Sequence, residues 1–402
     1  MSATPAPSPS YAQTVRSGLF ERLKTLVAGD LGPLPVIVGL AAVWIFFQTQ
    51  NANFLTSRNL SNLTLQMAVT AILAMAVVLV MVAGEIDLSL GSVTGVTSAL
   101  LGILLTNDHW STTAALAATF AAGLGIGVLQ GLVTVFVGVP SFLVTLGGFL
   151  AWAGVQLALI GPAGNLPVNN NTIAAIGNNY LGHTSAWLIA GGTIVVVAVV
   201  EALRLREWRR NGAPAPVVRS VLRVTGVAAG VCAIVAFLNG NFGVPYVLVL
   251  FLAVGAVLGW LMRRTFFGRY VYAVGGNAEA SRRAGVPVGV IRVAVLGLSG
   301  LLAGLAGVVS TSNLYATSAN VGGSILLLEA IAAAVIGGTS LFGGRGRIYM
   351  ALLGTLVIAS VHNGLGLLGK SASTEDIATG TILVLAVSLD ALNRRRRAAA
   401  GV

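Results

Sequence analysis

Long runs of apolar residues, separated by short polar segments, extend over almost the whole chain. A helix that crosses the hydrocarbon core of a bilayer needs about 20 consecutive, mainly apolar residues. Runs of this kind predict twelve membrane-spanning helices, at residues 33–50, 60–83, 88–105, 112–138, 141–160, 184–203, 217–238, 244–262, 291–312, 325–342, 348–368 and 376–393. The pattern therefore predicts an all-α polytopic integral membrane protein whose transmembrane domain covers residues 33–393.

The composition excludes several other classes of protein. Of the 402 residues, 56% are hydrophobic and only 9% are charged, whereas about a quarter of the residues in a soluble domain are charged. The single cysteine, Cys232, and three widely separated histidines exclude a disulfide scaffold and a Cys/His metal centre. No nucleophile with a base and no paired carboxylates are arranged for catalysis. We therefore expect no catalytic residue and no metal site.

The positions of lysine and arginine predict the orientation. If the N-terminus is cytoplasmic, twenty-one of the 23 basic residues lie on the cytoplasmic side, and only Arg58 and Lys370 lie outside. Basic loops stay in the cytoplasm, so both termini are expected there. Residues 1–32 are predicted to be a cytoplasmic tail with an interfacial helix, and residues 394–402 a basic cytoplasmic tail. The net charge of +11 then reflects topology, and no nucleic-acid binding is expected.

A polar segment at residues 263–290 contains signals for a short helix of its own. Asn277 is a favourable N-cap, and Glu279 lies in the first turn, where the helix dipole favours an anion. Arg283 lies in the last turn, and Gly285 ends the helix before a proline. The segment predicts a two-turn helix that projects into the cytoplasm and can transmit force from a soluble partner to the spans.

Four segments in order resemble the permease subunits of ribose- and xylose-type sugar ATP-binding-cassette importers. They read GEIDLSLGS at 84–92, VPSFLVTLGG at 139–148, FGRYVYAVGGNAEASRRAGV at 267–286 and EAIAAAVIGGTSLFGGRGRI at 329–348. The resemblance extends from about residue 57 to 390. The xylose-type branch fits best, because residues 184–240 contain two spans that shorter members lack and Glu85 replaces a common glycine. Glu329 stands where an aspartate is usual.

The resemblance implies a path for a neutral monosaccharide, a pentose such as xylose, across a bacterial plasma membrane. It implies a second permease copy, cytoplasmic ATPase subunits and an extracytoplasmic sugar-binding protein as partners, with membrane lipid around the chain. ATP and magnesium would be bound by the ATPase, and this chain itself would hold no cofactor. The residues implied to couple the chain to the ATPase are Gly275, Gly276, Asn277, Glu279, Ala280, Arg283 and Gly285.

Polar residues within the spans are candidates for the translocation path or gate, because charges in a membrane are costly. Glu329 lies about five residues into the tenth predicted span from the outside. It either lines the path or makes a structural bond between helices. Asn313, with Tyr315, either meets sugar hydroxyls or occupies an interfacial position.

Glu85 and Asp87 lie in the Gly-containing break AGEIDLSLG at 83–91. They either form an inner gate, or Asp87 simply caps the third span. A second break, IGGTSLFGG at 336–344, occupies a comparable position in the other half of the chain. The pair indicates an internal duplication.

Two further patterns invite a nucleotide-binding interpretation, and both have simpler explanations. Glycines recur at 123, 125, 127 and 131, which favours close helix packing. GLGLLGKS at 364–371 matches the Walker A pattern, but a P-loop follows a strand, and here a predicted span precedes it. Two functional alternatives stay open: a branched-chain amino acid permease of the same superfamily, and a secondary transporter with Glu329 and Glu85 as ion carriers.

Overall fold

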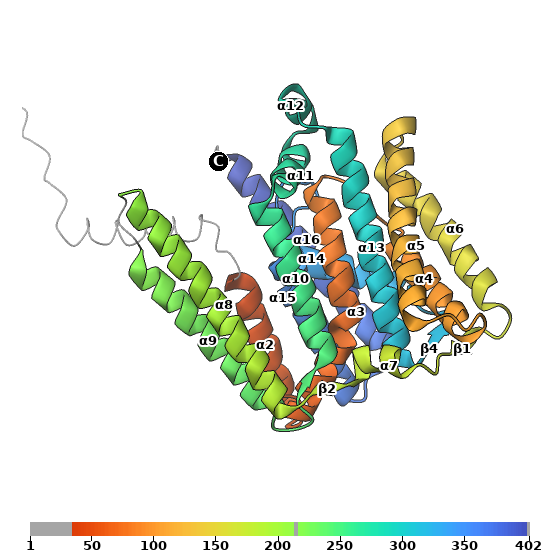
Figure 1. Ribbon diagram of the computed structural model, residues 1–402, viewed down its shortest axis with the longest axis horizontal. Helices are drawn as coiled ribbons and strands as arrows, with labels where there is room; N and C mark the ends of the chain where they lie inside the picture. Colours follow the sequence, from red (N-terminus) through yellow and green to blue (C-terminus); the bar gives the residue numbers. More distant parts are fainter. Residues whose placement is uncertain (1–33, 213–215, 400–402) are drawn as a thin grey trace, which may run out of the picture.

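The computed structural model describes residues 34–212 and 216–399, and these residues are mainly helical (Figure 1). The interfacial helix expected within residues 1–32 lies outside the described residues. The helices are α2 (Leu34–Gln50), α3 (Ser57–Val82), α4 (Leu90–Thr106), α5 (Thr112–Leu132) with the π-helical turn η1 (Val133–Val137), α6 (Ser141–Ile160), α7 (Asn171–Asn178), α8 (His183–Arg210), α9 (Val217–Leu238), α10 (Tyr246–Arg264), α11 (Phe266–Gly276), α12 (Ala278–Arg283), α13 (Val288–Leu314), α14 (Ser324–Ile336), α15 (Ile348–Leu367) and α16 (Ala372–Ala399).

Each of the twelve predicted spans contains a helix, and the chain is a multi-pass membrane protein. Within the described residues, eight helices are long and apolar enough to cross a membrane, whereas α2, α4 and α14 are shorter apolar helices. The tenth predicted span, 325–342, is wrong at its end, because α14 stops at Ile336 before Gly337 and Gly338. At the other extreme, α16 continues to Ala399, into the segment expected to be a tail.

The helices run between two ends of the molecule (Figure 1). One end carries α11 and α12, and we call it the α12 end. The other, the α7 end, carries α7 and four short strands: β1 (Asn165–Pro167), β2 (Tyr180–Leu181), β3 (Val244–Pro245) and β4 (Ala316–Ser318). β1 pairs antiparallel with β4, and β2 pairs antiparallel with β3.

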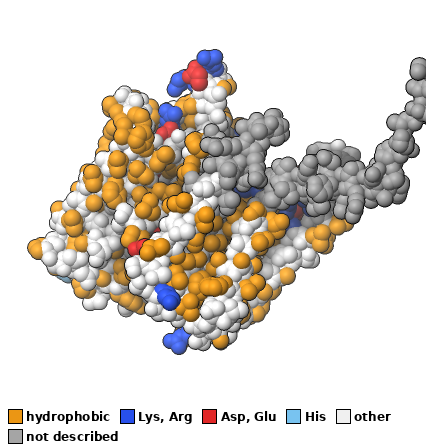
Figure 2. All heavy atoms as spheres, turned by 180° about the vertical axis from the view of Figure 1, so that it is seen from behind, with side chains coloured by type: hydrophobic (Ala, Val, Ile, Leu, Met, Phe, Trp, Pro, Cys, Tyr) orange, Lys and Arg blue, Asp and Glu red, His pale blue; other side chains and the backbone are white. Residues whose placement is uncertain are grey.

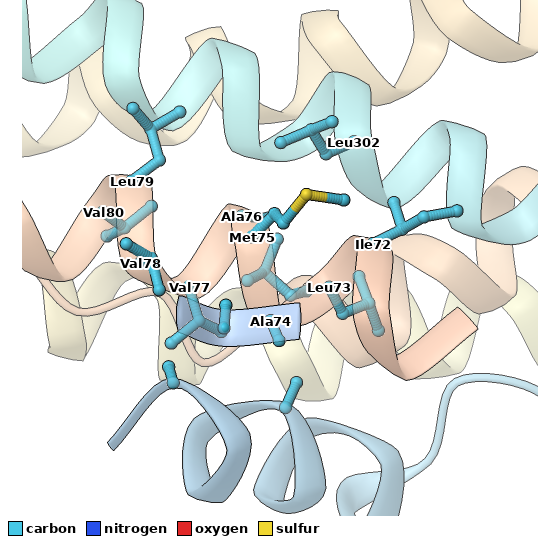
Figure 3. Close-up of a cluster of buried hydrophobic side chains, with 14 of the residues drawn as sticks. Ile72, Leu73, Ala74, Met75, Ala76, Val77, Val78, Leu79, Val80 and Leu302 are labelled. Carbon is cyan, nitrogen blue, oxygen red and sulfur yellow. The ribbon is translucent and has the colours of Figure 1, made fainter. Parts of the chain in front are cut away.

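The core is built around α3, whose part from Met67 to Val82 is almost entirely apolar and therefore suited to complete burial. Nine consecutive side chains, Ile72 to Val80, are buried, and Leu302 of α13 faces them (Figure 3). In contrast, α8 and α9 pack mainly on each other at the periphery (Figure 1), and side chains such as Leu188 and Val196 are exposed. Figure 2 shows apolar side chains over the sides of the molecule and few charged ones, as expected of a lipid-facing surface.

Three of the four glycines of α5, Gly123, Gly127 and Gly131, serve helix packing as predicted. A Cβ added at Gly123 or Gly127 would overlap the backbone carbonyl of Gly300 or Leu296 in α13. Gly125 has no neighbour that such a Cβ would meet. Small residues at every fourth position therefore bring α5 and α13 into close backbone contact.

Candidate functional site

The residues between α3 and α4 enter the protein from the α12 end as an extended segment. The backbone N–H of Ile86 donates to Ser141 Oγ (3.2 Å), and that of Leu88 donates to Thr145 Oγ1 (3.0 Å). Ser141 is the first residue of α6, and Thr145 lies one turn further along this helix, so the segment runs beside the start of α6. As a result, α4 begins inside the body of the protein and then continues to the α7 end.

A second non-helical segment, residues 316–323, enters from the α7 end; it is extended at β4 and then forms turns. Ser98 Oγ donates to Thr317 Oγ1 (2.9 Å), and a Cβ added at Gly322 would overlap the carbonyl of Gly91. The segment thus runs along α4 from Ser98 back to the first turn of that helix. Consequently α14, which follows directly, also begins inside the protein, close to the start of α4.

The molecule therefore contains two half-helices that start near one another and leave in opposite directions. α3, an extended segment and α4 form one unit, and α13, the non-helical segment 316–323 and α14 form the second with inverted direction. Backbone of this kind is tolerated at membrane depth only where protein or a water-filled cavity covers it. Pairs of discontinuous helices in inverted repeats are typical of substrate paths in transporters.

The two Gly-rich breaks that the sequence paired also meet, at the α12 end. Gly344 N–H donates to the carbonyl of Val82 (2.9 Å), and a Cβ added at Gly343 would lie 2.9 Å from Gly84 Cα. Gly275, at the end of α11, lies between them, because a Cβ there would overlap the same Val82 carbonyl. We call Gly84, Gly275, Gly343 and Gly344 the glycine junction.

A tyrosine of α11 reinforces this junction. The Tyr272 hydroxyl donates to the carbonyl of Gly346 (2.7 Å), and burial raises the pKa of this phenol above its ordinary value of 10.0. The phenol therefore stays protonated and able to donate. α11 is thus attached to the loop after α14 by a side chain as well as by close backbone packing.

The predicted short helix is present as α12, beside the glycine junction. Asn277 Oδ1 accepts from the N–H of Ala280 (2.9 Å), and Glu279 pairs with Arg282 (3.0 Å) and Arg283 (3.1 Å). Gly285 follows in a left-handed conformation, with φ of 84°. Gly276, Asn277, Glu279, Ala280, Arg283 and Gly285 are exposed. The helix offers a small polar surface to a partner, whereas Gly275 is packed inside.

A cleft of about 610 Å³ opens beside the first break, and Glu85, Arg282 and Arg292 supply its charged side chains. Glu85 Oε1 lies 2.6 Å from Arg292 Nε, and the glutamate side chain is only 7% exposed. This ion pair joins the break to the first turns of α13. Glu85 thus stands at the wall of the cleft.

Asp87 has a different environment and does not line the cleft. Its carboxylate accepts from the backbone N–H (2.9 Å) and hydroxyl (2.6 Å) of Ser89 and from the Ser299 hydroxyl (2.9 Å). These bonds fix the start of α4 against α13. The N-cap of α4 is Ser89, which makes no side-chain cap bond, so Asp87 does not cap the helix itself but holds its N-cap residue in place.

Glu329 contacts two other helices directly and is linked to a third through His362. The Thr70 hydroxyl of α3 donates to Glu329 Oε2 (3.2 Å), and His362 Nδ1 of α15 lies 3.7 Å from Oε1. His362 Nε2 in turn lies 2.5 Å from Thr379 Oγ1 of α16. Thr70 stands halfway along α3, so Glu329 lies deeper than five residues into a span would suggest, because α14 itself starts inside the protein.

Asn313 is not brought together with either carboxylate site. Its Nδ2 donates to the carbonyl of Leu65 in α3 (3.3 Å), and its Oδ1 leaves no room for a Cβ at Gly177 of α7. Tyr315, two residues on, is exposed and has a positive φ of 51°. These contacts place Asn313 in the packing of α13 against α3 and α7.

Sequence reasoning missed three residues that the structure brings into these sites: Arg292, His362 and Gln156. Each is a polar residue inside a predicted span or at its edge, which is the signal that a search for membrane polar groups uses.

The Walker A pattern at 364–371 lies at the end of α15 and in the turn after it, and a helix precedes it. It therefore lacks the strand that a P-loop requires. Within residues 34–212 and 216–399, no three His, Cys, Asp or Glu side chains are grouped to hold a metal ion.

Discontinuous helices that start inside a multi-pass membrane protein, joined to an exposed short helix at one end, define the class of membrane transport permeases. The chain belongs to the family described as "branched-chain amino acid transport system / permease component", whose model matches residues 59–387.

Its curated relatives include two xylose transport system permease proteins. That of Escherichia coli strain K12 is 36% identical over 94% of this chain and 96% of its own length, and that of Haemophilus influenzae is 35% identical over 90% and 96%. The ribose import permease of Escherichia coli strain K12 is 31% identical over 88% and 92%. No solved structure matches the chain.

Proposed function

We propose that this chain is the membrane permease subunit of an ATP-driven importer for a neutral monosaccharide, a pentose such as xylose. The observation that carries this function is the glycine junction, which connects the exposed helix α12 to both loops that flank the half-helices. The identities to relatives named as xylose permeases, 36% and 35%, against 31% for the ribose permease, support the choice of pentose.

The α12 end is cytoplasmic in this proposal, and the chain spans the bacterial plasma membrane twelve times with both termini inside. Arg263, Arg264, Arg282 and Arg283 lie at the ends of α10 and α12, and basic residues of this kind stay in the cytoplasm. The α7 end then faces the extracytoplasmic sugar-binding protein. Its β1–α7 segment, residues 165–178, has no charged side chain, which suits the delivery of a neutral solute.

The ATPase subunits contact α12 through Asn277, Glu279, Ala280 and Arg283. When ATP and magnesium close the ATPase pair, α12 moves with its surface, and α11 moves with α12. Because Gly275 is packed between the two loops, the motion reaches both together. The permease itself hydrolyses nothing and acts as a pair of copies.

Glu85 is the gating residue in this mechanism. Its ion pair with Arg292 spans the wall of the cleft at the α12 end. A shift of the glycine junction moves Gly84, which is the residue before Glu85, and so pulls directly on the ion pair between Glu85 and Arg292. Opening of the cleft toward the cytoplasm then follows from separation of the two side chains.

Two other functions are distinguishable by experiment. The family description names branched-chain amino acids, and the pairing of Glu329 with His362 offers a proton-carrying site to a secondary transporter. An amino acid permease would transport a different solute, and a secondary transporter would use a proton gradient instead of ATP.

Uptake into vesicles tests all three. Radiolabelled xylose, ribose and leucine are presented to vesicles that contain this chain, with and without the ATPase and the binding protein. We expect xylose uptake only with both partners and ATP. Leucine uptake would establish the amino acid permease instead, and uptake by the chain alone, abolished by Glu329→Gln, would establish the secondary transporter.

A further inference from the structure

A buried glutamine of α6 contacts the non-helical segment 316–323 and helps to hold it in place. Gln156 is 4% exposed, and its Nε2 donates to the carbonyls of Ser318 (3.0 Å), Ala319 (3.3 Å) and Val321 (2.9 Å). On its other side, its Oε1 occupies the space that a Cβ at Gly95 of α4 would need. One side chain therefore ties the segment to α4 and α6.

Two of the three carbonyls, those of Ala319 and Val321, have no other donor within the described residues, whereas the carbonyl of Ser318 also accepts from the N–H of Val321 (3.1 Å). Residues 318–321 are neither helical nor paired in the described strands beyond Ser318. A buried acceptor that loses its donor costs free energy, and the amide of glutamine is the only side-chain donor that these carbonyls have within the described residues. Removal of Gln156 would therefore leave the carbonyls of Ala319 and Val321 without a donor and loosen the segment between β4 and Gly322.

The segment ends in an exposed helix start. Gly322 packs against Gly91, but Gly323, Ser324 and Ile325 are exposed, and no side chain caps the first turn of α14. Thr70 of α3 contacts Glu329 of α14, and Ser324 precedes Glu329 toward the α7 end. Counting the helix rise along α3 and α14 places Ser324 roughly 12 Å from the α7 end of α3. That depth falls within the hydrocarbon of a bilayer.

Hydrocarbon cannot cover such a surface, because the first N–H groups of a helix have no partner within it. The carboxylate of Glu329, on the same helix, is also 16% exposed, and a charge is costly in lipid. Both features favour an aqueous surface along the first turns of α14.

We propose that Gln156 is a positioning residue of the transport cycle, which anchors residues 318–321 inside the membrane and so keeps the start of α14 open to the aqueous sugar path. The inference rests on the proposed function and extends it, because it assigns the face of the molecule along which the sugar passes. Gln156 itself does not contact the sugar; it acts through the segment that it holds.

The first test measures xylose uptake by the complete transporter. Gln156→Leu keeps the size but removes the donor, and we expect maximal uptake to fall by about tenfold or more. Gln156→Asn, which retains a donor, restores part of it, and Gly95→Ala, which displaces the glutamine, resembles Gln156→Leu. Gly154→Ala, at an exposed glycine of α6 with open space around it, leaves uptake unchanged. Normal uptake in both Gln156→Leu and Gly95→Ala would overturn the proposal.

The second test locates the aqueous face and uses the single cysteine of the chain. In a Cys232→Ser background, Ser324→Cys is treated with a negatively charged, membrane-impermeant methanethiosulfonate. We expect labelling at Ser324→Cys, about tenfold slower labelling once Gln156→Leu is added, and none at Val195→Cys, which is 60% exposed on the peripheral helix α8.

Absence of labelling at Ser324→Cys, or equal labelling with and without Gln156→Leu, would overturn the inference. The labelling needs no substrate, so it is independent of the sugar assignment. If Ser324→Cys labels as expected while the native transporter fails to take up xylose, the proposed substrate is wrong and the positioning role stands.

Discussion

A single glycine, Gly275, determines whether α11 can approach the rest of the protein. Its Cα faces the carbonyl of Val82 so closely that any side chain would overlap it. Gly276, the next residue, has open space at the corresponding position. Two adjacent glycines of the same motif therefore have different physical roles, and the sequence alone treats them as equivalent.

This difference predicts different outcomes for two alanine substitutions. Gly275→Ala pushes α11 away from both loops, so we expect ATP hydrolysis by the assembled transporter to continue while xylose uptake falls by about tenfold or more, a loss that corresponds to at least ~1.4 kcal/mol. Gly276→Ala, the matched control, should retain near-normal uptake. Paired ATPase and uptake assays on the same vesicles check this, and equal losses in both variants would contradict the junction as the transmission point.

Glu85 and Arg292 offer a second test at the residue scale. The glutamate is buried, but the arginine side chain is 32% exposed, so solvent screens the pair and its coupling should be modest, about 1 kcal/mol. We expect Glu85→Gln to raise ATP hydrolysis in the absence of sugar severalfold, because the cleft opens more easily.

A double-mutant cycle with Arg292→Gln measures this pair directly. The two single variants should each raise sugar-independent hydrolysis, and the double variant should add little to either. Full additivity would mean that the two side chains act separately and that the pair is not the gate.

At the scale of the element, α12 is the part that sequence reasoning described best. Its N-cap, its acidic first turn, its basic last turn and its terminating glycine are all local signals, and the helix forms where they predict it. Its charged pairs are exposed, with Glu279 57% exposed, and such pairs contribute little to stability.

Reversal of the charge of Glu279 should therefore change binding and leave folding intact. We expect Glu279→Lys to change the free energy of unfolding by less than ~0.5 kcal/mol, and to reduce both ATPase association and xylose uptake strongly. Glu207→Lys, a charge reversal at another exposed position, is the control. Thermal unfolding, ATPase co-purification and uptake check the pair, and normal ATPase association of Glu279→Lys would exclude α12 as the docking helix.

The half-helices were harder to predict than the helices themselves. The sequence located the break at 83–91 from its glycine and acidic residues, but it treated α14 as the start of a full span. Nothing in the apolar pattern distinguishes a helix that begins at the membrane surface from one that begins inside, because both are surrounded by apolar residues. Gln156 and residues 318–321 lie far apart in the chain, so their contact depends on the tertiary structure.

At the scale of the whole molecule, each of the twelve spans that the apolar pattern predicts contains a helix, since each is determined by its own residues, whereas α7 and α11 were not predicted. The pattern could not show how the helices meet. The sequence paired the breaks at 83–91 and 336–344 as repeats, whereas the structure makes residues 316–323 the inverted counterpart of the first break and joins the two Gly-rich breaks at the glycine junction. Tertiary packing decides such relations.

The peripheral hairpin of α8 and α9 provides the last prediction. Its two helices pack mainly on each other, and the strands that flank it are already side by side, with Leu181 paired to Val244 in the β2–β3 ladder. Replacement of residues 182–243 by a two-residue Asn-Gly turn, which suits a tight antiparallel connection, should therefore leave the other helices in place. We expect the shortened chain to insert into membranes and to retain ATP-dependent xylose uptake within about threefold of the native rate. A threefold change in rate corresponds to a change of about 0.7 kcal/mol in the barrier.

Loss of uptake with normal insertion would instead show that the hairpin takes part in transport. Loss of insertion would show that the core depends on the contacts of the hairpin with Leu248 and Val249 of α10.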